Sequence, residues 1–266
     1  MTPAPSLPSR TELVTIVVEG AVGRITLNAP ERLNAVDAAM LETIADGVTA
    51  LGARPDIRVI TVTGTGRGFC SGAHLDAVSG LDDVGATTLD SVGRAIRALV
   101  GSPVPVLGLV NGVAAGVGFS LALATHYILA AESASFLLGF NKIGLMPDGA
   151  ATALVAASAG RARALRLALT GEQISAATAL DWGLIAQTCP DEEFGEVAHH
   201  LEQAFANGAP QALAATAAAI NAATLPELHQ VLAREEVGQR QLLTTDDFRE
   251  GVLAFRERRT PRFHGE

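Results

Sequence analysis

Residues 106–118 of the chain read Val-Leu-Gly-Leu-Val-Asn-Gly-Val-Ala-Ala-Gly-Val-Gly, and Phe-Ser-Leu-Ala-Leu-Ala follows over 119–124. The apolar run Val106–Val110 is typical of a strand that is buried on both faces of a sheet. The glycine-rich run Asn111–Gly118 predicts a turn, and the apolar Ala115–Ala124 predicts a short helix. A buried strand that turns into a helix is a building unit of an α/β fold with a parallel sheet.

The first half of the chain contains further units of this kind. Ile57–Thr63 predicts a second buried strand, and the glycine-containing stretch Gly68–Leu75 follows it. Other elements are predicted by β-branched runs or by helical spacing of apolar residues: a hairpin at Leu13–Glu19 and Ala21–Leu27, helices at Asp37–Leu51 and Leu89–Val100, and a strand at His126–Ala131. Asp37 is a plausible cap of the first helix. We therefore expect an α/β fold with a largely parallel core.

The pattern changes toward the C-terminus. From Ala150 onward alanine-rich helical patterns dominate, and no convincing strand is found beyond the few residues around Ile185. We expect a flexible N-terminal tail over residues 1–12, an α/β core over 13–190 and a helical region over 191–266. A chain of 266 residues is long enough to bury a sizeable core.

Composition limits the function. The formal net charge of −9, with no basic tract, argues against nucleic-acid binding, but the bases are 18 Arg and one Lys, and arginine suits a small phosphorylated ligand. Two cysteines cannot form a disulfide framework, so we expect a reduced, cytoplasmic setting and no metal site. The apolar stretch Ala98–Ala131 is interrupted by prolines and glycines, so membrane insertion is not expected.

The two glycine-rich turns suggest a chemistry. Backbone N–H groups at a helix start favour an anion or a polarised carbonyl oxygen, so two such turns facing one cleft could form an oxyanion hole for an ester or thioester. Glycine also serves close packing, and this reading stays open beside the first. The run Gly116–Gly118 lacks the third glycine of a dinucleotide fingerprint, and the residues around Ser120 lack the last glycine of a nucleophile elbow.

With these turns the chain resembles the crotonase, or enoyl-CoA hydratase/isomerase, superfamily over nearly its whole length. The resemblance is carried by motifs that occur in the family's order: Ala29–Ala35, Gly68–Leu75, Asn111–Gly118, Ile143–Asp148, Leu169–Gly171, Ala179–Ile185, Asp247–Gly251 and Phe255–Phe263. It implies a spiral of ββα units with a helical C-terminal region that assembles as a homotrimer or a dimer of trimers. It also implies acyl-CoA or enoyl-CoA as the ligand, a role in fatty acid metabolism and no separate cofactor.

The resemblance also implies roles for individual residues. The backbone N–H groups of Ala73 and Val117 correspond to the family's oxyanion hole. Positions that correspond to contacts with coenzyme A are Arg32, Ala35, Ser71, Gly72, His74, Leu75, Gly116, Phe255 and Arg258.

Two departures from the family pattern affect the reaction. In hydratases two Glu side chains activate the added water, and their positions hold Ser120 and Phe140 here, neither of which can act as a general base near neutral pH. Ordinary hydratase activity is therefore doubtful. Asp148 is a candidate acid or base, or alternatively caps a helix over Gly149–Val155. The open hypotheses are an enzyme that stabilises an enolate, a non-catalytic acyl-CoA binding or carrier protein, and an isomerase, thioesterase or dehalogenase using Asp148.

Overall fold

The structure is a computed structural model that describes residues 13–74 and 84–266. Within these ranges the larger sheet has six strands, in the spatial order β1 (Val14–Glu19), β2 (Val22–Leu27), β3 (Val59–Gly64), β5 (Val106–Val110), β7 (Tyr127–Ala131) and β10 (Gln187–Cys189). The β1–β2 hairpin is antiparallel, and every other pairing in this sheet is parallel. The predicted hairpin and the predicted parallel core are both confirmed.

A second, smaller sheet lies beside the first. Its four strands have three residues each and follow the order β4 (Gly68–Cys70), β6 (Val113–Ala115), β8 (Ser135–Leu137) and β9 (Gln173–Ser175). Along the chain, β4, β6 and β8 each follow a strand of the larger sheet, which is the ββα repeat that the resemblance implies. The expectation of no strand after Ala150 other than near Ile185 was wrong for β9, which is too short to show a periodic pattern.

The three helices predicted over Asp37–Leu51, Leu89–Val100 and Ala115–Ala124 are present, although the second begins five residues earlier, at Val84. The helices between Ala150 and residue 190 lie where the sequence showed an alanine-rich helical pattern. In chain order these helices are α1 (Ala38–Gly52), α2 (Val84–Val100), α3 (Val117–Leu123), α4 (Ala151–Ala159), α5 (Arg161–Thr170) and α6 (Ala176–Asp181), with short 3₁₀ turns η1 (Pro30–Arg32), η3 (Phe140–Ile143) and η4 (Asp191–Glu193). Asp37 caps α1 as predicted, because its Oδ1 accepts the Met40 N–H at 2.9 Å. Helix α3 begins two residues later than expected because β6 takes up Val113–Ala115.

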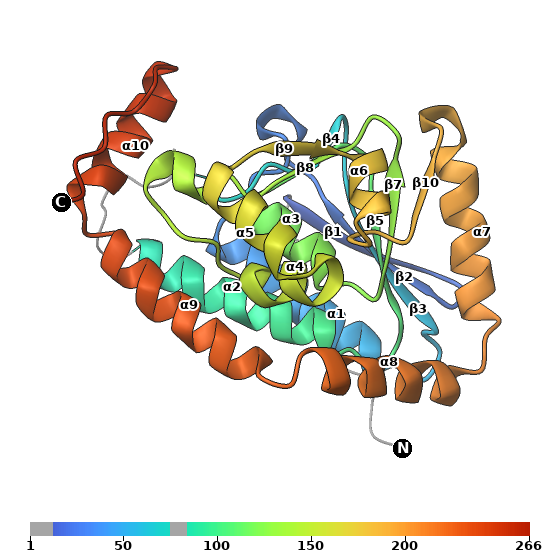
Figure 1. The fold of residues 1–266 in the computed structure, drawn as a ribbon. Helices are drawn as coiled ribbons and strands as arrows, with labels where there is room; N and C mark the ends of the chain where they lie inside the picture. Colours follow the sequence, from blue (N-terminus) through green and yellow to red (C-terminus); the bar gives the residue numbers. More distant parts are fainter. Residues whose placement is uncertain (1–12, 75–83) are drawn as a thin grey trace.

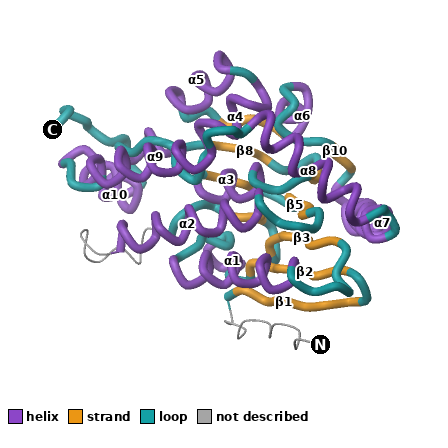
Figure 2. Tube along the Cα trace, turned by 90° about the horizontal axis from the view of Figure 1, so that it is seen from below, coloured by secondary structure: helices purple, strands orange, loops and turns teal. Residues whose placement is uncertain are grey.

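Helices cover both faces of the larger sheet. On one face α1, α2 and α3 contribute to the main apolar core, while α7 (Phe194–Ala206) packs against β3 and β7 on the other. All five residues of β5 are buried, as its apolar sequence predicts. Figure 1 shows α7 standing beside the β10 edge, and Figure 2 shows α1 lying along the β1–β2 hairpin.

The C-terminal region is helical and returns to the core. Helices α8 (Pro210–Thr224), α9 (Leu228–Leu242) and α10 (Asp246–Glu257) follow one another along the rim of the molecule (Figure 1). Helix α9 packs on α2 and α4, and α10 packs on η3. The path of α9 therefore places its side chains beside the loop before α4. In the described part of the chain, no helix has the length and apolar character needed to cross a bilayer.

Candidate functional site

The two glycine-rich turns are in contact with each other. Gly116 has φ 52° and ψ −126°, and Gly72 has φ 106°, backbone conformations that side chains rarely allow. A Cβ on Gly72 would lie 3.1 Å from the carbonyl oxygen of Ala115, so the turns pack backbone to backbone. The glycines therefore serve close packing and, at the same time, bring two runs of backbone N–H groups together.

The two candidate oxyanion donors lie next to these glycines. Val117 is the first residue of α3 and is buried, whereas Ala73 is exposed and forms a parallel bridge with Val36. Between described residues, neither the Ala73 N–H nor the Val117 N–H donates a backbone hydrogen bond. A helix leaves its first N–H groups without an intrahelical acceptor, which accounts for Val117.

The predicted coenzyme A motif is joined to the first turn. The Arg32 guanidinium lies 2.9 Å from Nδ1 of His74 and forms an ion pair with Asp37 at 3.2 Å. The Ser71 hydroxyl donates to the carbonyl oxygen of Arg32 at 3.0 Å, and Ala35 is buried beneath the motif. Arg32, Ala35, Ser71, Gly72 and His74 therefore form one cluster, while Leu75 lies outside the described residues.

Asn34 holds this cluster in place. Its side chain is fully buried, and its Oδ1 accepts the Ala29 N–H at 2.8 Å. Its Nδ2 donates to the carbonyl oxygens of Thr65 at 3.0 Å and Gly68 at 2.8 Å. Asn34 has φ 57°, a left-handed conformation that asparagine tolerates better than most residues. One side chain thus joins η1 to the turn that leads into β4.

Ser120 and Phe140, which the resemblance aligns with the two glutamates of hydratases, are buried. The Ser120 hydroxyl donates to the backbone carbonyl of Asp148 at 2.8 Å, which ties α3 to the loop before α4. Phe140 is 7% exposed, and its ring tip would lie 3.7 Å from a Cβ on Gly116. An apolar ring therefore borders the turn at Gly116.

Asp148 is one of two buried carboxyls in this region. Its Oδ2 accepts the Nε2–H of Gln239, on α9, at 2.9 Å, while its Oδ1 is buried without a hydrogen-bond partner among the described residues. Burial raises the pKa of Asp148 to about 7; the Gln239 hydrogen bond counteracts this effect, and the charge of Glu235 adds to it. The alternative in which the Asp148 side chain caps the next helix was wrong, because its carboxyl bonds to Gln239 instead.

The cap of α4 comes from α9. Glu235 is 2% exposed and accepts the N–H of Ala150 at 2.6 Å, the N–H of Thr152 at 3.1 Å and the hydroxyl of Thr152 at 2.5 Å. Burial raises the pKa of Glu235, and these hydrogen bonds counteract the rise. Glu235 therefore supplies to α4 the acceptor that Asp148 would have supplied in the cap alternative.

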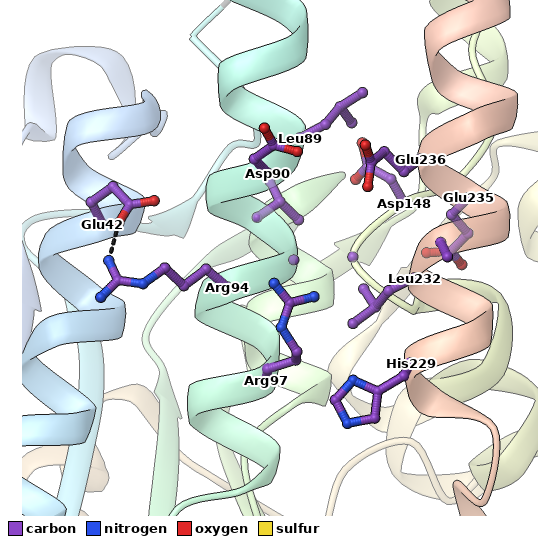
Figure 3. A pocket seen from close by; sticks show the side chains of 14 residues that line it. Glu42, Leu89, Asp90, Arg94, Arg97, Asp148, His229, Leu232, Glu235 and Glu236 are labelled. Atoms are coloured by element: carbon purple, nitrogen blue, oxygen red, sulfur yellow. Dashed lines mark hydrogen bonds and ion pairs between the residues drawn. The ribbon is translucent and has the colours of Figure 1, made fainter.

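A cavity of about 350 Å³ opens beside Asp148 and Gly149. Figure 3 shows Asp148 and His229 at opposite ends of it, with α2 on one side and α9 on the other. Val92 and Leu232 contribute apolar walls. The cavity brings the Asp148 carboxyl together with these apolar walls and with charged side chains such as Asp90, Arg94 and Glu236. Its described lining includes no residue of the two glycine-rich turns.

Comparison with known proteins establishes the family and the fold. The family described as "Enoyl-CoA hydratase/isomerase" matches residues 18–266. The chain belongs to the enoyl-CoA hydratase/isomerase family. Its crotonase-type fold is shared with an enoyl-CoA hydratase of known structure from Mycobacterium avium subsp. paratuberculosis, at 42% identity and a TM-score of 0.89 over 95% of this chain and 98% of the other.

Relatives within the enoyl-CoA hydratase/isomerase family carry different activities in their names. A 1,2-epoxyphenylacetyl-CoA isomerase from Escherichia coli is 39% identical over 96% of this chain and 99% of its own length. A probable enoyl-CoA hydratase from Rhodobacter capsulatus is 40% identical over 91% of this chain and 93% of its own length. Similarity of this degree establishes the family, but the names of these relatives do not agree on one reaction.

Two predicted coenzyme A contacts lie away from the cluster around Arg32, and two residues near Asp148 were not predicted. Phe255 and Arg258, at the end of α10, have exposed side chains, and no hydrogen bond or ion pair between described residues joins them to the cluster around Arg32. Gln239 and Glu235 were not predicted as site residues. Their spacing of four residues on an amphipathic helix shows that they share a face, but nothing local shows that this face meets Asp148.

Proposed function

We propose that this protein binds an acyl-CoA thioester and isomerises its acyl group by proton transfer. The N–H groups of Ala73 and Val117 hold the thioester oxygen, and Asp148 acts first as the base and then as the acid. The observation that carries this proposal is the buried Asp148 carboxyl, whose pKa of about 7 lies near neutral pH and whose Oδ1 has no partner among the described residues. A general acid–base group works best when its pKa is near the operating pH.

Hydration is the less favoured reaction. The resemblance implies that hydratases activate water with two glutamates, and here a hydroxyl and a phenyl ring occupy those positions. The Ser120 hydroxyl already donates to the Asp148 carbonyl, and Phe140 cannot hold a water molecule as a carboxylate does. Glu235 is engaged by the N–H groups of α4, whereas Asp148 has an oxygen without a partner among the described residues. The Asp148 carboxyl therefore suits a reaction in which the same group removes and returns a proton. A relative named as an isomerase of a CoA thioester supports the same choice.

The proposed reaction needs no further reactant. The Asp148 carboxylate accepts a proton from a carbon of the acyl group, and the electrons of that C–H bond move toward the thioester carbonyl. The resulting enolate oxygen is stabilised by the two backbone N–H groups. The Asp148 carboxylic acid then returns the proton to another carbon of the conjugated system. A double bond moves along the acyl group, and no atom is gained or lost.

The binding of the thioester is proposed in two parts. The acyl group enters the cavity beside Asp148, whose apolar walls include Val92 and Leu232. Coenzyme A lies along the cluster of Arg32 and His74, where two cationic or polar side chains adjoin the turn at Ala73. Arg32 is also paired with Asp37, so part of its charge is already compensated before a phosphate arrives.

Deuterium exchange tests the proposed function. Acyl-CoA and enoyl-CoA thioesters incubated in D₂O should gain deuterium at the carbons that Asp148 serves, as measured by mass spectrometry. Asp148→Asn should slow this exchange by at least about 100-fold, because general acid–base catalysis contributes about 10²–10⁴-fold. The matched control is Asp181→Asn on the exposed surface of α6, which should exchange like the wild type.

Binding is measured on the same variants. A CoA thioester should raise the melting temperature of both, because a ligand that binds the native state stabilises it. Exchange by Asp148→Asn at the wild-type rate would refute the proposed function. If the wild type binds thioesters but exchanges no proton, the non-catalytic binding protein is the better description. Release of free thiol would indicate a thioesterase.

We further propose a cytoplasmic homotrimer or dimer of trimers. Large apolar side chains remain exposed on several helices, among them Leu169, Ile220, Val237, Leu253 and Phe255. Exposed apolar surface favours contacts between copies of a chain. Light scattering after size-exclusion chromatography should give three or six chains, and a monomer at micromolar concentration would contradict this assembly.

A further inference from the structure

Gln239 has both ends of its side-chain amide engaged inside the protein. The residue is 1% exposed, its Oε1 accepts the backbone N–H of Met146 at 3.3 Å, and its Nε2 donates to Oδ2 of Asp148 at 2.9 Å. A backbone N–H can only donate, so the opposite orientation of the amide would place two donors against each other. The Met146 N–H therefore fixes which end of Gln239 faces Asp148.

This orientation distinguishes the two oxygens of Asp148. Because the Gln239 amide cannot turn over, Oδ2 always faces the Nε2–H. Oδ2 therefore accepts a hydrogen bond in both protonation states of the carboxyl. A proton placed on Oδ2 would turn that oxygen into a hydroxyl, which accepts the Nε2–H less well than a carbonyl oxygen does. Oδ1 is buried with no partner in the described structure, and it is free to carry the proton.

We propose that Gln239 is a positioning residue that places the exchangeable proton of Asp148 on Oδ1 and holds the carboxyl ready to ionise. This inference rests on the proposed function only for its catalytic consequence. Gln239 contacts Asp148 and the backbone of Met146, and its effect on the reaction passes through Asp148. The same helix carries the opposing influence, because Glu235 lies one turn earlier and its negative charge favours the protonated form of Asp148.

Other charged groups facing this region are mostly compensated by partners. From α1 and α2, Glu42 pairs with Arg94, and from α2 and α9, Asp90 and Glu236 both pair with Arg240. The remaining charged or titratable side chains that line the cavity are Arg97 on α2 and His229 on α9. Gln239 and Glu235 are the polar side chains of α9 that act on Asp148 itself, one by a hydrogen bond and one by its charge.

The experiment measures where the Asp148 carboxyl titrates. Protein with ¹³C-labelled aspartate carboxyl groups is followed by NMR against pH, and the Asp148 signal is assigned by its absence in Asp148→Asn. Gln239→Leu should move the titration midpoint upward by about one to two pH units, since it removes a hydrogen bond to a charged group. Glu235→Gln should move it downward. Gln230→Leu, on the exposed face of the same helix, is the matched control and should leave it unchanged.

Opposite shifts of the Asp148 titration midpoint in Gln239→Leu and Glu235→Gln would distinguish a specific effect on Asp148 from a general loosening of the packing around it. An unchanged midpoint in Gln239→Leu, or a shift in the same direction for both variants, would overturn the inference. If Gln239→Leu does not fold, Gln239→Glu keeps an acceptor for the Met146 N–H and should also raise the midpoint, because two carboxyls then share the site. In a catalytically active protein the pH dependence of deuterium exchange should move with the NMR midpoint. Shifted midpoints together with full exchange by Asp148→Asn would refute the proposed function and leave the positioning by Gln239 intact.

Discussion

Replacement of Asn34 tests how the cluster of Arg32, Ser71 and His74 is held. Asn34→Ala removes two buried hydrogen bonds and one partly buried hydrogen bond. The Ala29 N–H and the Thr65 carbonyl lose the partner that Asn34 supplies, while the Gly68 carbonyl keeps a longer bond from Asn111 at 3.4 Å. At a net value of about 1 kcal/mol for each bond, with a further cost for the orphaned groups, the free energy of unfolding should fall by about 3–4 kcal/mol.

The backbone at this position allows a second, finer comparison. With φ at 57°, an alanine at position 34 is strained by about 1–2 kcal/mol, whereas glycine is not. Glycine loses about 0.4–1 kcal/mol through the greater freedom of the unfolded chain, so the strain should decide the sign. We therefore expect Asn34→Gly to be more stable than Asn34→Ala by about 0.5–1 kcal/mol.

Urea unfolding at one protein concentration, followed by far-ultraviolet circular dichroism, measures both differences. The shift of melting temperature by a CoA thioester should also shrink in both variants, because Asn34 joins η1 to the turn before Gly72. A loss below about 1 kcal/mol for Asn34→Ala would show that the three bonds do not hold the cluster. A less stable Asn34→Gly would show that the left-handed backbone carries no strain.

Three further predictions concern pH and close packing. Asp148→Asn should be more stable than the wild type above neutral pH. The pKa of Asp148 is raised from 3.8 to about 7 in the folded state, so the wild type loses stability as pH rises through that interval, by up to about 4 kcal/mol at 1.36 kcal/mol per pH unit. Unfolding curves of the two proteins at pH 4 and pH 8 measure this difference. The Nδ1 of His126 accepts the Val106 N–H at 3.0 Å, and burial lowers the pKa of His126. Its contribution to the free energy of unfolding is therefore present above pH 6.5 and is lost on acidification. His126→Gln should reduce the pH dependence of the melting temperature between pH 7 and pH 5, and an unchanged slope would contradict this. Gly118→Ala places a Cβ 2.2 Å from the Cys70 carbonyl oxygen, so it should unfold the protein or cost more than about 3 kcal/mol, and a normal melting temperature would show that α3 can move away from β4.

Features that depend on nearby residues were predictable. The Asp37 cap of α1 follows from a carboxylate directly before a helical pattern, and the burial of Val106–Val110 follows from an uninterrupted apolar run. That the two glycine-rich turns could face one cleft was raised from their positions after buried strands, and the family resemblance assigned the donors Ala73 and Val117. Strands as short as Ser135–Leu137 were not predicted, because three residues are too few to show an alternation of apolar and polar side chains. Such strands are held by pairing with strands distant in the sequence.

The cap alternative for Asp148 shows why the rest of the site could not be predicted. An aspartate shortly before a helix is, by local rules, a cap. Here Glu235, 85 residues after Ala150, caps α4 through the fold of the C-terminal region, and the Asp148 carboxyl is left with one hydrogen bond and one unpartnered oxygen. If Asp148 had to cap α4, its charge would be held by backbone N–H groups and its pKa would be lowered. Glu235 on α9 therefore has two effects on the proposed reaction. It caps α4, which leaves the Asp148 carboxyl free of that role, and its charge raises the pKa of Asp148. Chemistry at Asp148 thus depends on where α9 packs, which no local pattern around residue 148 could reveal.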